Sequence, residues 1–263
     1  MRTAVSAAVA GAISLALGGC VIIANGPGSH DVIVNAAPET DHAALYAEAV
    51  ADPRRPADEV ARDPLRYPAE MLAFIGLQPG DVIADIRPEE GYFTRLFAPV
   101  VGPTGRVFAF VPNQTAAREN VHGDTLASTY PNVSRITAAL EDMPFGRPVD
   151  VVFTAQEYHD FVIPRFGVDV ARMNAAVFAA LKPGGLYVIL DHQAAPGAGL
   201  EVVATLHRIE GAALRRQVEA AGFVFEAETK VVANPDDDHS LNVFDPAIRG
   251  RTDQFVYRFR KPG

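Results

Sequence analysis

The strongest constraint on the fold is a repeated alternation of short apolar runs and amphipathic segments, which begins at Pro68. Runs such as 107–111 and 186–190 contain only apolar residues and Tyr, which is typical of strands buried on both faces of a sheet. Parallel strands need a crossover connection, and the amphipathic segments between the runs can supply it as helices. The sequence therefore predicts a doubly wound, mostly parallel α/β sheet.

Seven segments of this region have strand character. They are residues 81–86, 106–111, 132–136, 150–154, 186–190, 223–232 and 254–260. Helices are predicted over residues 69–75, 91–100, 173–181 and 206–221. No helix is predicted between the last two strands, so we expect them to form a hairpin at the edge of the sheet.

Length and charge limit the function classes. The chain has 263 residues, of which 49% are apolar, and this suits one large domain with appendages better than two domains. Its formal net charge is −9, so the long-range attraction to phosphate backbones on which nucleic-acid binding relies is absent. We therefore expect a small-molecule ligand and no nucleic-acid partner, and the oligomeric state stays open.

The N-terminus has the layout of a secretory signal. Met1-Arg2 precedes a small, apolar run over 4–17, and Leu17-Gly18-Gly19-Cys20 follows. This box resembles the signal of bacterial lipoproteins, which implies removal of residues 1–19, a lipid on Cys20 and a periplasmic protein held on a membrane. Val21 after the Cys is, by the same resemblance, compatible with the outer membrane. The alternatives are ordinary cleavage nearby and a retained anchor, although the 14-residue run is shorter than the roughly 20 residues that span a bilayer.

Residues 20–66 are predicted to connect this anchor to the domain at 67–263. Residues 21–40 are rich in turn formers, and residues 41–50 have helical spacing. Charged residues and prolines then dominate up to Asp63, which indicates a solvated connection with a short cap helix. No functional role is expected for Arg54 or Arg55.

Beyond these patterns, residues 68–261 resemble the class I S-adenosylmethionine-dependent methyltransferases. The order of the elements and the Leu181-Lys182-Pro183-Gly184-Gly185 turn before a strand carry this resemblance. Gln156–Asp160, Asp191-His192, Leu206–Glu210 and the tail from Phe244 resemble, more narrowly, a bacterial family described as predicted methyltransferases. The resemblance implies a Rossmann-like, seven-stranded sheet and, for an active member, S-adenosylmethionine as cofactor.

The cofactor loop departs from the pattern of these methyltransferases. Their first strand ends in an acidic residue followed by alternating glycines, which let the backbone approach the cofactor. Asp85 and Gly91 match that pattern, whereas Arg87 and Glu89 stand in place of the first two glycines. The second strand should end in a carboxylate that binds the ribose, but here it ends at Val111. Both halves of the nucleoside site are altered.

The size of these changes can be estimated. A non-glycine residue in a left-handed turn costs about 1–2 kcal/mol, and a lost hydrogen bond to a charged acceptor costs roughly 1.5–3 kcal/mol. Together they predict on the order of two to four decades of lost affinity for S-adenosylmethionine. The alternative is that the loop takes another course and still binds the cofactor.

Polar side chains follow the fourth and fifth predicted strands. Tyr158, His159 and Asp160 come after the fourth, and Asp191 and His192 close the fifth. Ligands of such sheets bind beyond the carboxyl ends of the strands, so we expect the two His-Asp pairs to face one another. Three interpretations stay open: a structural network, a catalytic or binding site with His159 or His192 as general base, and a metal site. The last would use His159, His192 and a carboxylate, but no diagnostic ligand spacing supports it.

Other residues are candidates for the same cleft. Gln156 follows the fourth strand, and we place it on the cofactor side. His207 and Arg208 are expected to begin a helix and to point into the cleft, and Arg208 and Arg249 are candidates for binding an anionic group. Ion pairs that anchor the fold are the alternative for both arginines. The loop at 234–239 is long enough to fold back as a lid.

Two functional hypotheses follow. The first is an exported protein with the methyltransferase fold, a degenerate S-adenosylmethionine site and another small ligand or partner, with no cofactor assigned. The second is an active S-adenosylmethionine-dependent methyltransferase with an atypical cofactor loop. Arg87 and Glu89 favour the first, and so does the cytoplasmic origin of S-adenosylmethionine. Asp85 and Gly91 keep the second open.

Overall fold

Seven strands form one sheet in the order β3-β2-β1-β4-β5-β7-β6 in the computed structural model, which describes residues 42–263. The strands are β1 (Val82–Ile86), β2 (Arg106–Pro112), β3 (Val133–Ala138), β4 (Val149–Ala155), β5 (Leu181–His192), β6 (Val224–Thr229) and β7 (Gln254–Arg260). β1 to β5 pair in parallel, whereas β7 runs antiparallel to both β5 and β6. This confirms the predicted doubly wound sheet with a terminal hairpin.

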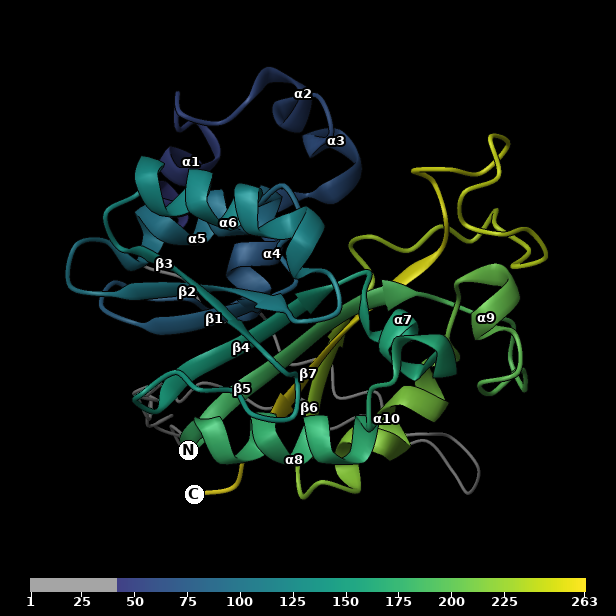
Figure 1. Ribbon diagram of the computed structural model, residues 1–263. Helices are drawn as coiled ribbons and strands as arrows, with labels where there is room; N and C mark the ends of the chain where they lie inside the picture. The colour runs from purple at the N-terminus through teal and green to yellow at the C-terminus, as the bar shows by residue number, and fades with distance from the viewer. Residues whose placement is uncertain (1–41) are drawn as a thin grey trace, which may run out of the picture. The chain divides into compact units, whose positions relative to one another are not determined.

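Helices cover both faces of the sheet (Figure 1). They are α1 (Ala43–Val50), α2 (Ala57–Val60), α3 (Asp63–Arg66), α4 (Pro68–Ile75), α5 (Tyr92–Val101), α6 (Ala116–Thr129), α7 (Tyr158–Val162), the 3₁₀ turn η1 (Pro164–Phe166), α8 (Val170–Ala180), α9 (Val203–Leu206) and α10 (Gly211–Glu219). One apolar core, with Phe97 and Phe153, lies under α1, α4 and α5. A second core, with Met173 and Phe259, lies under α8 and α10.

The segment before the sheet packs into the domain more closely than predicted. Tyr46 of α1 is 2% exposed, and its hydroxyl donates a hydrogen bond to the carbonyl of Leu77 at 2.9 Å. The buried Glu59 of α2 binds Arg95 of α5 at 2.5 Å. Arg55 is also buried and pairs with Asp63 at 2.6 Å. The expectation of a solvated connection is therefore wrong for these residues, because their charges are paired and withdrawn from water.

Three further differences concern helices. Neither α6 nor α7 was predicted. The predicted helix over 206–221 is shorter, because α9 ends at Leu206, His207 has a φ of 53°, and α10 spans only Gly211–Glu219. The chain leaves the helical path there because Ile209 forms a parallel bridge with Gln193, and its N–H donates to the carbonyl of His192 at 2.9 Å.

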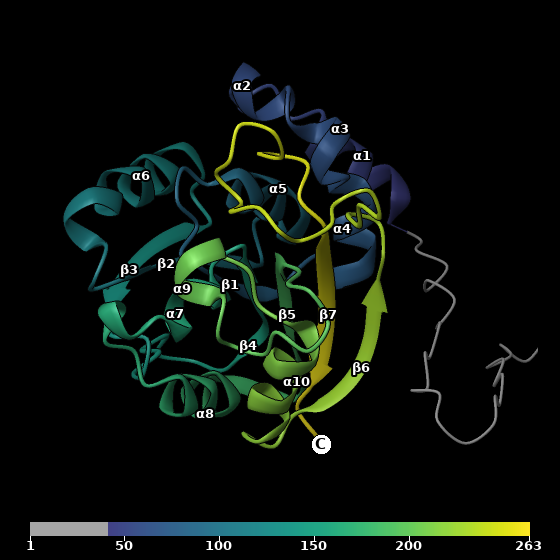
Figure 2. The ribbon, with the colours of Figure 1, turned by 90° about the vertical axis from the view of Figure 1, so that its right-hand side faces the viewer.

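Loops from distant parts of the sequence meet at the carboxyl ends of β4 and β5. Figure 2 shows the long connection between β6 and β7, in yellow, close to α2 and α3. The strand order reverses between β1 and β4, and ligands of open α/β sheets bind at such a switch point. None of the helices within residues 42–263 has the length and apolar character required to cross a bilayer. The predicted signal and Cys20 lie outside the described residues.

Candidate functional site

The turn after β1 keeps a glycine-like backbone without the glycines. Arg87 and Glu89 have φ values of 54° and 49°, and Gly91 has a φ of 100°. A side chain at Gly91 would also collide with Leu126, whose Cδ2 lies 2.5 Å from the position of a Cβ. The loop therefore does not take another course. The loop holds Arg87 and Glu89 in the left-handed region of the backbone, which is strained for residues other than glycine.

The Arg87 side chain lies across the switch point. It is 8% exposed and contacts three carboxylates from two other elements. Its Nε lies 3.2 Å from Glu119 of α6, and its Nη1 pairs with Glu157 and lies 3.2 Å from Asp160 after β4. The side chain of Glu89, in contrast, is 53% exposed, and its Oε1 lies 3.9 Å from Arg87 Nη2. Of the two residues that replace glycines, Arg87 alone occupies the crevice.

Little space remains beside Arg87. A cavity of about 30 Å³ lies between Arg87, Asp85 and Gln156, and one of about 10 Å³ lies between Arg87, Thr115 and Asp160. Small-molecule sites usually measure roughly 300–1,000 Å³. At the end of β2, Val111 is fully buried and brings no carboxylate. The volumes are too small for a nucleoside.

Asp85 is buried at the end of β1. It is 2% exposed, and the hydroxyl of Thr94 donates a hydrogen bond to its Oδ2 at 2.6 Å. Burial raises the pKa of Asp85 to about 7, because its charged form loses hydration without a cationic partner.

A histidine cluster lies next to Arg87, at the ends of β4 and β5. Asp191 of β5 accepts a hydrogen bond from the backbone N–H of His159 at 2.8 Å, and its Oδ1 lies 2.7 Å from His159 Nδ1. Burial disfavours a charge on His159, but the adjacent Asp191 carboxylate outweighs it and raises the pKa of His159. Asp191 therefore fixes both the backbone and the ring of His159.

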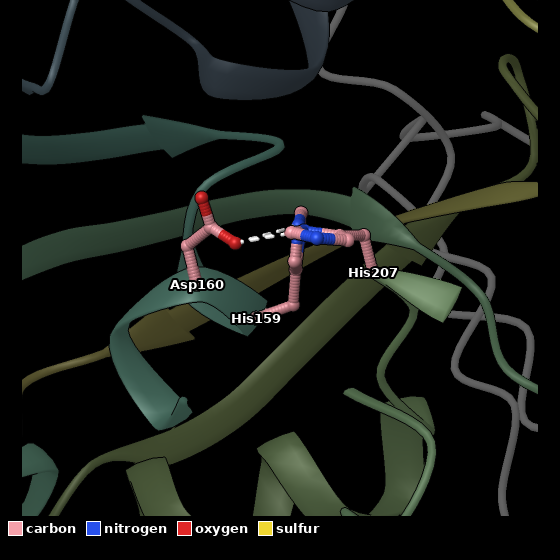
Figure 3. A group of neighbouring side chains, drawn as sticks. All are labelled: His159, Asp160 and His207. Carbon is pink, nitrogen blue, oxygen red and sulfur yellow. Dashed lines mark hydrogen bonds and ion pairs between the residues drawn. The ribbon is translucent and has the colours of Figure 1, made fainter. Parts of the chain in front are cut away.

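Asp160 and His207 complete this cluster (Figure 3). His207 Nδ1 lies 2.9 Å from Asp160 Oδ1, and His159 Nε2 lies 3.4 Å from the same oxygen. The rings of His159 and His192 are 5.7 Å apart, and His192 Nδ1 lies 2.8 Å from the hydroxyl of Thr252. Burial lowers the pKa of His192 to about 3, so this imidazole is neutral. The predicted meeting of the two His-Asp pairs is confirmed.

Two candidate residues make structural contacts. Tyr158 is fully buried, and its hydroxyl accepts a hydrogen bond from Asn174 of α8 at 2.8 Å. This burial and the bond to α8 favour a structural function, and a catalytic function of Tyr158 stays a prediction. Arg208 is fully buried and binds Asp237 at 2.8 Å. The ion-pair alternative thus holds for Arg208, which anchors the loop between β6 and β7.

A cavity of about 480 Å³ lies beside the cluster. Gln156, His192 and Arg249, all singled out in the sequence, line it together with Glu89 and the β6–β7 loop. Among the lining residues that the sequence did not predict, Arg62, Leu65 and Arg66 come from the segment around α3. Their charges had indicated only a solvated surface, and no local pattern in the sequence shows that α3 covers the cleft.

Arg66 is the most confined of the cavity arginines. Its Nη2 donates a hydrogen bond to Gln156 Oε1 at 3.1 Å, and its guanidinium carbon lies 4.7 Å from the centre of the Tyr92 ring. Burial lowers the pKa of Arg66. Within residues 42–263, no carboxylate lies at ion-pair distance from Arg62, Arg66 or Arg249. Three arginines therefore line the cavity without an ion-pair partner, and the carboxylates of Glu89 and Glu90 line it as well.

Comparison with known proteins identifies the fold. No model of a protein family matches the chain, and no protein of curated function is similar to it. A methyltransferase from Aquifex aeolicus that depends on S-adenosylmethionine has a similar structure, with a TM-score of 0.55, 16% identity and coverage of 80% of this chain and 96% of the other. The YcgJ protein of Bacillus subtilis gives a TM-score of 0.52 at 15% identity, over 74% of this chain and 97% of the other.

An arsenic(III) S-adenosylmethionine methyltransferase from Chlamydomonas reinhardtii has a TM-score of 0.51 at 16% identity, over 83% of this chain and 73% of the other. These similarities show the class I methyltransferase fold that the sequence predicted. Membership of the methyltransferase superfamily and of the narrower bacterial family stays a prediction, because identities of 15% and 16% show the fold alone.

Proposed function

We propose that this protein binds a small anionic molecule in the 480 Å³ cavity and does not use S-adenosylmethionine as a methyl donor. The observation that carries the proposal is the buried Arg87 side chain, which crosses the switch point and contacts Glu119, Glu157 and Asp160. The same crevice holds the cofactor in open α/β folds of this kind.

Arg87 cannot leave the crevice without a large cost in free energy. Its departure would leave the carboxylates of Glu119, Glu157 and Asp160 without their shared cation, and Glu119 and Glu157 are 3% and 4% exposed. Breaking a buried ion pair by removing one partner costs about 3–5 kcal/mol. A cofactor would have to supply that amount in addition to the strain of the loop.

The properties of the large cavity suit an anionic ligand. Its volume of about 480 Å³ is within the usual range for small-molecule sites, roughly 300–1,000 Å³. The guanidinium groups of Arg62, Arg66 and Arg249 present planar donors that match carboxylate or phosphate oxygens. The neutral His192 adds a ring nitrogen as donor or acceptor.

Ligand-observed NMR with a set of carboxylate and phosphate fragments tests this site. We expect fragments to bind the wild type and to lose binding in Arg66→Gln/Arg249→Gln. The matched control is Arg106→Gln, because Arg106 lies at the amino end of β2 and contacts Ser134 at 3.0 Å. Equal binding by all three proteins, or none by the wild type, would refute an anion site in this cavity.

A second candidate function, methyl transfer, is favoured by one observation. The turn from Arg87 to Gly91 keeps the left-handed φ values that a glycine-rich loop needs. In that case S-adenosylmethionine would be the cofactor, and His159 or His192 would supply the general base. Direct binding of S-adenosylmethionine to the wild type separates the two functions.

We further propose that the protein is exported and carries lipid on Cys20. The Leu17–Cys20 box after an apolar run supports this localisation. Export also agrees with a protein that does not depend on a cytoplasmic cofactor. Labelling with radioactive palmitate in a bacterial host should mark the wild type in the membrane fraction and leave Cys20→Ser unlabelled. Equal labelling, or none in either protein, would refute lipidation at this residue.

A further inference from the structure

We propose that His159, Asp160 and His207 form a binding site for a divalent transition-metal ion of the zinc type. One ligand atom from each residue lies within 4.8 Å of the others. Two imidazoles and one carboxylate form a common ligand set for Zn²⁺ and its neighbours in the first transition row. This site adjoins the crevice that Arg87 fills, because Arg87 contacts Asp160, and it does not require the anion cavity to be occupied.

The distances in the cluster fit an ion placed between the side chains. Two ligands that lie ~2.1 Å from one ion at a tetrahedral angle are about 3.4 Å apart. His159 Nε2 and Asp160 Oδ1 are 3.4 Å apart, which is long for a hydrogen bond. His207 Nδ1 lies 2.9 Å from the same oxygen, and a small rotation of its ring would open this contact. Figure 3 shows all three groups converging on one point.

The surroundings already hold two of the ligands in the required orientation. Asp191 binds His159 Nδ1 at 2.7 Å, so the other ring nitrogen, Nε2, faces Asp160. A carboxylate behind a histidine is the usual outer partner of a metal ligand, because it fixes the ring and raises its basicity. Arg87 binds Asp160 Oδ2 at 3.2 Å and leaves Oδ1 for an ion.

The site is also open on one side. The side chains of Asp160 and His207 are 15% and 13% exposed, whereas that of His159 is 3% exposed. Three protein ligands with an open position are characteristic of zinc sites that bind a water molecule or a substrate. The ring of His192, which lines the large cavity, lies 5.7 Å from that of His159. An ion at this place would therefore lie near any ligand in that cavity.

Titration of the metal-free full-length protein with Zn²⁺ tests the site, and Co²⁺ serves as an absorbing substitute. We expect one ion per chain and the visible absorption of tetrahedral Co²⁺. Asp160→Asn should weaken binding of both ions. His207→Asn should weaken it by about 100-fold or more, above the effect of losing an outer partner. Asn suits this position because it tolerates the left-handed backbone of His207, whose φ is 53°.

Two controls make the result decisive. His122→Ala removes a histidine of α6 outside the cluster, and Cys20→Ser removes the one thiol of the chain. Both should bind Zn²⁺ as the wild type does. Circular dichroism with a chelator checks that His207→Asn and Asp160→Asn are folded. The proposal is overturned if the wild type does not bind Zn²⁺, or if the two cluster variants are folded and bind it with wild-type affinity.

Discussion

Arg87 stabilises three carboxylates that would otherwise repel one another at the switch point. We predict that Arg87→Met lowers the free energy of unfolding by about 3–5 kcal/mol, because it leaves the buried Glu157 carboxylate without a cationic partner. Arg118 is the matched control, since it also binds Glu119, at 2.8 Å, but is 69% exposed. Arg118→Met should change stability by about 0–1 kcal/mol. Urea unfolding at neutral pH measures both, and equal effects would contradict the role assigned to Arg87.

The raised pKa of Asp85 makes the stability of the folded protein depend on pH. The unfolded chain releases its proton near pH 3.8, whereas the folded protein keeps it until about pH 7. Between these values unfolding releases a proton, so the Asp85 contribution to stability falls as the pH rises and is constant above about 7. Asp85→Asn removes this pH-dependent contribution to stability, and the amide oxygen can still accept a hydrogen bond from the Thr94 hydroxyl.

The stability of Asp85→Asn relative to wild type should therefore increase from acidic to neutral pH. The expected slope is on the order of 1.4 kcal/mol per pH unit within that window. Urea unfolding of both proteins at a series of pH values measures the difference. A difference that does not change with pH would show that Asp85 ionises normally in the folded state.

Residue identities alone indicated which positions were unusual, but not how they are paired. The replacement of glycine at Arg87 was visible, since the flanking Asp85 and Gly91 fixed the alignment with the methyltransferase pattern. Its partner Glu119 lies on a helix that was not predicted, 32 residues further along the chain. Which carboxylate an arginine meets depends on the packing of whole elements, and no local pattern encodes it.

Among the elements, the loop between β6 and β7 is held in part by the buried Arg208. Arg208 binds Asp237 and also donates to the carbonyl of Leu241 at 2.9 Å. We predict that Arg208→Met releases this loop and speeds limited proteolysis within residues 234–250. Arg215→Met should not do so, because Arg215 forms an exposed pair with Glu219 on α10. Cleavage at the wild-type rate in both variants would show that other contacts hold the loop.

Strands were predictable where burial on both faces made the sequence continuously apolar, as in β1 and β5. The same reasoning missed α6, which buries only Glu119, Gly123 and Leu126 and so lacks an apolar stripe. It also extended α10 too far, since the helical pattern of 206–221 gives no sign of the Ile209 bridge. The local pattern of apolar residues identifies helices and strands that bury much apolar surface. Tertiary contacts determine where the other helices form and end.

At the scale of the whole molecule, the sheet topology explains where the candidate residues meet. Asp85 and His192 lie at the carboxyl ends of β1 and β5, and His159 follows β4, so their side chains gather at one edge of the sheet. That meeting was predictable from the order of helices and strands. The cavity lining from α3 and the β6–β7 loop was not, because it depends on how these connections fold back over the sheet.

We propose that Arg87 closes the S-adenosylmethionine site. Calorimetric titration of the full-length protein with S-adenosylmethionine and with its demethylated product tests it most directly. The structure predicts no binding by the wild type and some gain of binding in Arg87→Gly/Glu89→Gly, where the crevice is cleared and the loop strain removed. Micromolar binding of S-adenosylmethionine by the wild type would contradict the claim and establish a working cofactor site.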